Sequence, residues 1–212
     1  MAHGQATDDR ELNDYIKYWK ERVFFEPSSA TFHYNLGVGY VNKGLIDEAI
    51  SEFKQALQYD PNLAQAYVNI GGLLFQKGDI DQCIIVNLKA LSLDPGLAMA
   101  HSNLGFAYLQ KGDPLKAIES SRRAIELVPD LVQALNNLAV AYLQTDQPDA
   151  SIEASQKILE LDDRFAPAYF NLAVAFRSKD DPLKARDYYE RARELGLPIH
   201  EETAGDWSTP DR

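Results

Sequence analysis

The protein has 212 residues, of which 45% are hydrophobic and 25% charged, and a formal net charge of −11. This composition is typical of folded proteins, and the negative charge disfavours nucleic acid and anionic membranes, which attract clustered cations. No apolar run approaches the ~20 residues of a membrane span, and the first residues lack the apolar stretch of a secretory signal. Cys83 is the only cysteine, so no internal disulfide and no thiolate zinc site is expected. We therefore expect a soluble, cytoplasmic protein.

The first predicted element is a helix within residues 1–29. Tyr15, Trp19 and Val23 recur at intervals of four residues, so they share one helical face. Pro27, which follows this helix, lies 34 residues before Pro61 and thus keeps the spacing of the repeats described next. The pattern predicts an unpaired helix that caps the N-terminal side of a repeat array.

Residues 30–199 consist of five blocks of 34 residues that align without an insertion: 30–63, 64–97, 98–131, 132–165 and 166–199. In each block an aliphatic residue is followed by Gly or Ala, as in "NLGVGY", and small residues recur further on. Each block holds two helical patterns around a turn such as "KGDID", and Pro61, Pro95 and Pro129 end the second helix of the first three. One such pair cannot bury its apolar face alone, so neighbouring pairs must stack.

The period and the order L-G-x-x-Y…A…A…P resemble those of the tetratricopeptide repeat family. This resemblance implies an all-α, right-handed α-solenoid (a superhelix) of antiparallel helix pairs, in which the first helices line the concave surface. Asp163 and Leu197 depart from the family by replacing the closing Pro. In the last block, Arg186 and Arg193 replace columns of Ile and Leu that would pack on a further repeat, so the array is predicted to end there and residues 200–212 to be disordered.

One Asn returns at the same place in every block, on a helical stripe separate from the packing stripe: Asn35, Asn69, Asn103, Asn137 and Asn171. A second polar column follows, of Asn42, Gln76, Gln110 and Gln144, and the residues between the two columns include Val38, Phe106, Val140 and Val174. A primary amide can pair with a backbone C=O and N–H together. The pattern therefore predicts a surface that binds an extended peptide. It is similar to the asparagine ladder in the superhelix of O-linked N-acetylglucosamine transferases, although their catalytic domain has no counterpart here.

Two other interpretations of the sequence remain open. The Asn column is common at this position in the family, and its amides could instead bond a neighbouring helix. Ile85 and Val86 stand where other blocks carry mostly polar residues, so they could mark a second contact or a dimer patch on the convex face.

The functional prediction is a binding protein without catalytic, metal or cofactor sites, because no nucleophile–base pair, ligand spacing or phosphate loop stands out. We expect a monomeric scaffold, adaptor or assembly factor that holds a flexible segment of a partner protein. The alternatives are a structural subunit that uses its convex face or ends, and a regulatory partner of a separate enzyme.

Overall fold

The computed structural model describes residues 2–197, with side chains described from Asp9 onward. In this range every regular element is an α-helix, and short turns join the helices. Its elements are α1 (Ala2–Phe25), α2 (Ala30–Asn42), α3 (Ile46–Tyr59), α4 (Ala64–Gln76), α5 (Ile80–Leu93), α6 (Ala98–Gln110), α7 (Pro114–Leu127), α8 (Val132–Gln144), α9 (Pro148–Leu161), α10 (Ala166–Ser178) and α11 (Pro182–Glu194). The expected all-α repeat fold is thus confirmed, and each of the five predicted blocks contributes one helix pair. The chain divides into two compact units, residues 1–95 and 96–212.

The first unit contains α1 to α5, and its core is built from buried residues of α1, α2, α3 and α4. Ile16 of α1 is buried there, with Trp19 and Val23 packed alongside, and the Trp19 ring lies 5.6 Å from the ring of Phe32. Tyr15, by contrast, is 38% exposed. The Tyr15 ring nevertheless lies against α2, since a Cβ atom added at Gly39 would be 3.1 Å from it. The capping face of α1 therefore includes the predicted residues and also Ile16.

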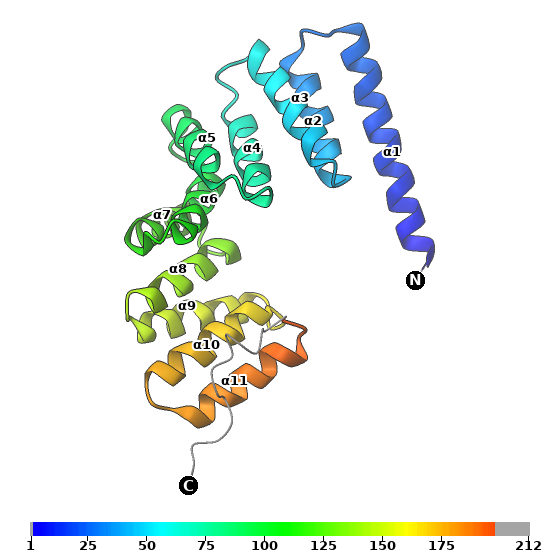
Figure 1. Ribbon diagram of the computed structural model, residues 1–212. Helices are drawn as coiled ribbons and strands as arrows, with labels where there is room; N and C mark the ends of the chain where they lie inside the picture. Colours follow the sequence, from blue (N-terminus) through cyan, green and yellow to red (C-terminus); the bar gives the residue numbers. More distant parts are fainter. Residues whose placement is uncertain (1, 198–212) are drawn as a thin grey trace. The chain divides into compact units, whose positions relative to one another are not determined.

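The second unit contains α6 to α11, which follow one another as helix pairs, each with a first and a second helix (Figure 1). The first helices of its three repeats, α6, α8 and α10, are neighbours, since α8 contacts both of the others. Each second helix packs on its own first helix, and α7 and α9 also pack on the first helix that follows. Buried Leu, Ile, Ala and Tyr side chains fill the spaces between these helices.

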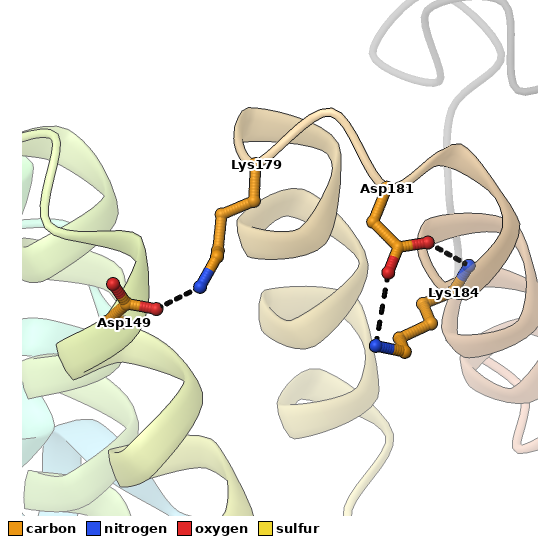
Figure 2. Close-up of polar contacts among 4 residues, drawn as sticks. All are labelled: Asp149, Lys179, Asp181 and Lys184. Carbon is orange, nitrogen blue, oxygen red and sulfur yellow. Dashed lines mark hydrogen bonds and ion pairs between the residues drawn. The ribbon is translucent and has the colours of Figure 1, made fainter.

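A polar contact recurs between successive repeats. Lys179, after α10, pairs with Asp149 at the start of α9 (Figure 2), and Lys77 pairs with Asp47 in the same way, 30 residues apart. The side chain of Lys43 donates to Asn13 of α1 at 2.6 Å, which is again 30 residues away. Asn13 thus holds the position of Asp47 one period earlier, so α1 takes the place of a second helix in a half repeat.

The turns inside the repeats share one backbone conformation. Gly44, Gly78 and Gly112 have positive φ, and in the last two repeats Asp146 (φ 55°) and Asp180 (φ 57°) take the same left-handed conformation. The Asp181 carboxylate then caps α11 by accepting the backbone N–H of Lys184 at 3.2 Å and pairs with the Lys184 ammonium (Figure 2). These contacts lower the pKa of Asp181 below its usual value.

Candidate functional site

The first helices of the repeats are almost free of charge. Across α2, α4, α6, α8 and α10, Arg177 is the one Asp, Glu, Lys or Arg residue. The charged residues lie instead on α1, on the second helices and in the turns. We call the solvent-accessible side chains of these five helices the first-helix surface, and describe it separately in each unit.

The Asn column lies deeper than the sequence indicated. In the second unit Asn103, Asn137 and Asn171 are all buried, with 8%, 1% and 4% of their surface exposed. In the first unit Asn35 and Asn69 are half-buried. Burial of the three amides in the second unit leaves a partner almost no access to them.

The amides bond the preceding first helix. Asn137 donates its side-chain N–H to the carbonyl of Ser102 at 3.0 Å, and Asn171 donates to the side-chain oxygen of Asn136 at 2.8 Å. In the first unit, Asn69 donates to the hydroxyl of Tyr34 at 3.2 Å. In all three cases the acceptor lies 35 residues earlier, so the contact repeats with the fold. The expected use of Asn137 and Asn171 as peptide ligands is therefore corrected: their donors already join adjacent repeats.

Asn35 differs from the other members of the column. It stands on the first helix of the first repeat, which is preceded by α1 in a second-helix position and by no other first helix. Among the described residues it has no hydrogen-bond partner for its side chain, and it is half-buried. Asn35 is thus the amide of the column that remains available to a partner.

The second polar column faces solvent as expected. Asn42 and Gln76 in the first unit, and Gln110 and Gln144 in the second, are all exposed. The residues between the columns are half-buried: Val38 in the first unit, and Phe106, Val140 and Val174 in the second. Met99 of α6 is 44% exposed, although the sequence analysis did not select it; it lies one turn before Asn103 and could have been found from that spacing.

Of the proposed second contact, Ile85 is 56% exposed on α5, whereas Val86 is half-buried and packs against the core of the first unit. The expectation of two exposed aliphatics is therefore corrected for Val86. Leu88, one turn further along α5, is 48% exposed and takes its place beside Ile85.

The histidine at the repeat start is a core residue in the first repeat. His33 is buried, and its two ring nitrogens lie 2.6 Å from a Glu52 carboxylate oxygen and 3.0 Å from the Pro27 carbonyl. Across residues 2–197, no three His, Cys, Asp or Glu side chains gather in a way that could hold a metal ion. None of the described helices has the length and apolar character needed to cross a membrane.

Sequence profiles of tetratricopeptide repeats match residues 39–78, 64–97, 96–164 and 130–197. Together these matches cover residues 39–197, from within α2 to the end of α11. The chain belongs to the tetratricopeptide repeat family. Proteins of this family generally bind other proteins.

Solved structures of other tetratricopeptide repeat proteins superpose on the chain. MamA is 28% identical with a TM-score of 0.65, and the match covers 80% of this chain and 96% of MamA. YrrB, described as having an unusual peptide-binding site, is 19% identical with a TM-score of 0.69 and coverages of 88% and 95%. PilF of Pseudomonas aeruginosa is 22% identical with a TM-score of 0.70 and coverages of 82% and 79%. No curated protein matches the sequence.

Proposed function

We propose that this tetratricopeptide repeat protein is an interaction module, each unit of which can hold an extended, uncharged segment of a partner protein on its own part of the first-helix surface. The observation that carries the proposal is the near absence of charge from five helices in a chain with 21 cationic and 32 anionic residues. Burying an unpaired charge is costly, so a surface that receives apolar and backbone groups gains by lacking charges of its own.

The exposed amides and half-buried apolar side chains divide the recognition between them. Gln110 and Gln144 each offer one acceptor and two donors to a partner's backbone, and in the first unit Asn35 and Asn42 offer the same groups. Phe106 and Val140, one turn before the glutamines, present partly accessible apolar surface, and so does Val174 of α10. Backbone contacts are independent of sequence, so the apolar side chains supply the preference for particular residues.

Peptide selection tests the proposal. The full chain would be immobilised and used to select from a phage library of random 12-residue peptides. We expect selected peptides that are poor in Asp, Glu, Lys and Arg. Their binding should weaken at least tenfold in the double variant Gln110→Glu, Gln144→Glu, because the exposed carboxylates would have to be desolvated on binding.

The matched control is Glu119→Gln, which changes an exposed charge on α7 in the same unit and should leave binding unchanged. A library that yields no binders, or binders rich in charge that are insensitive to the glutamate variants, would refute the proposal.

The exposed pair Ile85 and Leu88 favours a second candidate function, that of a structural subunit docked through α5. A double variant with Glu at these two positions would separate the two candidates. It should abolish incorporation into a larger assembly while leaving the selected peptides bound.

A further inference from the structure

A pocket of about 200 Å³ lies between α7, α8 and α9. Its lining includes Ile125 of α7, Leu135 and Leu138 of α8 and Ala154 of α9, and it is also bordered by Tyr142 of α8, whose hydroxyl accepts hydrogen bonds from Arg122. Leu135, Leu138 and Ala154 are buried, so they form an apolar inner part of the pocket, whereas Tyr142, Glu153 and Lys157 give the rest of its lining a polar character. An engineered apolar cavity of ~150 Å³ accommodates benzene, and this pocket is therefore large enough for one aromatic ring.

Three of the other four repeats carry a larger residue at the position of Ala154, and the third repeat has the small residue Ser120 there. The positions of Ala154 in the first, second and fifth repeats hold Glu52, Val86 and Tyr188. Each of these fills the corresponding place: Glu52 pairs with His33, Val86 packs on the core of the first unit, and Tyr188 stacks on Phe176 with ring centroids 5.5 Å apart. In the fourth repeat, Ala154 is too small to fill the corresponding space.

Two opposite charges stand at the rim of the pocket. Glu153 and Lys157 are both lining residues, and they lie four residues apart on α9. Glu153 is exposed and Lys157 is half-buried. Within residues 2–197 neither forms an ion pair, although several other charged residues of the second helices do. A partner can therefore pair with both without displacing an existing contact.

We propose that this pocket receives one aromatic side chain from an amphipathic helix of a partner protein. That helix would carry a cation opposite Glu153 and a carboxylate opposite Lys157, on the same face as the aromatic residue. Residues three or four apart share a helical face, so a partner with Arg, Phe and Glu at positions i, i+3 and i+4 presents all three groups together. An apolar anchor in a pocket with flanking polar contacts is a common way of docking a helix.

A designed peptide tests the assignment with the full chain. The probe is an Ala-rich helical 16-mer carrying Arg, Phe and Glu at i, i+3 and i+4, and its reversed-charge counterpart has Glu, Phe and Arg. Binding would be followed by the methyl NMR signals of Leu135 and Leu138. We expect saturable shifts with the first peptide, and at least tenfold weaker binding by the reversed peptide and by a peptide with Ala in place of Phe.

Two variants of the protein complete the test. Ala154→Tyr copies the residue of the fifth repeat, which this fold already accommodates, and should weaken binding at least tenfold by filling the recess. Exchange of the rim charges, Glu153→Lys with Lys157→Glu, should reverse the preference between the two peptides. The matched control is Asp187→Lys, which alters the charge at the Glu153 position of the fifth repeat, where Tyr188 fills the site, and should change nothing.

Several outcomes would overturn the assignment. Absence of saturable shifts at Leu135 and Leu138, or binding that is unaffected in a folded Ala154→Tyr variant, would show that the pocket is not a docking site. Binding of indole alone, with no contribution from the rim charges, would assign the pocket to a small aromatic ligand. Self-association that Ala154→Tyr abolishes would assign it to a second copy of this chain.

Discussion

Asn137 shows how a residue that looks like a ligand can belong to the scaffold. Its side chain is almost fully buried and donates to the Ser102 carbonyl on the preceding first helix. We expect Asn137→Ala to lower the free energy of unfolding by about 1–3 kcal/mol, because a buried hydrogen bond is lost and its acceptor is left less well satisfied. Urea denaturation followed by circular dichroism measures this.

Asn35→Ala is the matched control, since Asn35 occupies the same repeat position without a side-chain hydrogen bond among the described residues. Its effect on stability should stay within about 0.5 kcal/mol, while its effect on peptide binding should be the larger of the two variants. If Asn137→Ala left the stability unchanged but abolished peptide binding, Asn137 would be a peptide-binding residue and not a structural one.

The sequence predicted the Asn column but not its depth. A helical wheel places Asn137 on a stripe separate from the packing residues, and that separation is correct. What the wheel cannot give is the distance between adjacent first helices. Ser102 of α6 is small and buried, and α8 approaches it closely enough for Asn137 to bond its carbonyl, so that a stripe expected at the surface becomes part of the contact. Asn35 has no preceding first helix and stays partly accessible.

Cys83 gives a pH-dependent prediction. Burial raises the pKa of its thiol above the usual value of 9.0, and a hydrogen bond from Asn87 opposes this shift in part. Because the folded state then disfavours the thiolate more than the unfolded chain does, the stability that Cys83 contributes is intact below about pH 9 and decreases as the pH rises above it.

The urea midpoint of the wild type should therefore fall, relative to that of Cys83→Ala, as the pH rises from about 9 to about 10.5. Ala is a suitable reference because Ala49 and Ala117 occupy the same position in other repeats. A constant difference between the two proteins over this range would contradict the prediction.

At the scale of the helix pair, close approach depends on matched residues rather than on glycine alone. A Cβ atom added at Gly71 of α4 would lie 2.2 Å from the side-chain nitrogen of Asn87 on α5, which is itself fully buried. We expect Gly71→Ala to lower stability by about 1–3 kcal/mol through overpacking.

The second change Asn87→Ser should restore much of that loss. The fourth repeat already combines Ala139 with Ser155 at these two positions, and both are buried. Thermal unfolding of the two single variants and the double variant measures the coupling, and purely additive effects would show that the two side chains do not share this contact.

Helix boundaries could be predicted well because the signals recur five times. The 34-residue alignment places a turn after each first helix, and the structure has one at each of those places. Asp146 and Asp180 show that the left-handed turn conformation persists even where glycine is absent. In α1, which has no repeat partner to average the pattern, Ile16 is buried but was not predicted.

Across the whole molecule, charged residues are common on the second helices and nearly absent from the first helices. The net charge of −11 lies on α1, on the second helices, in the turns and in the terminal segments, while the first helices carry only Arg177. Composition alone suggests a strongly electrostatic protein, and only the repeat alignment reveals that one class of helix is neutral. The overall charge favours solubility, whereas the first-helix surface is suited to a different kind of contact.

This sorting predicts that partner binding depends little on salt. Exposed charge pairs are screened over ~10 Å at 0.1 M ionic strength and over ~3 Å at 1 M, whereas amide and apolar contacts are not. We expect the Kd of a selected uncharged peptide to change by less than about threefold between 50 mM and 500 mM NaCl, measured by isothermal titration calorimetry. The charged helical peptide proposed for the α9 pocket provides the internal contrast, because its pairing with Glu153 and Lys157 should weaken over the same range. Equal and steep salt dependence of both peptides would mean that charges outside the first helices govern binding, and the first-helix surface would then lose its assigned role.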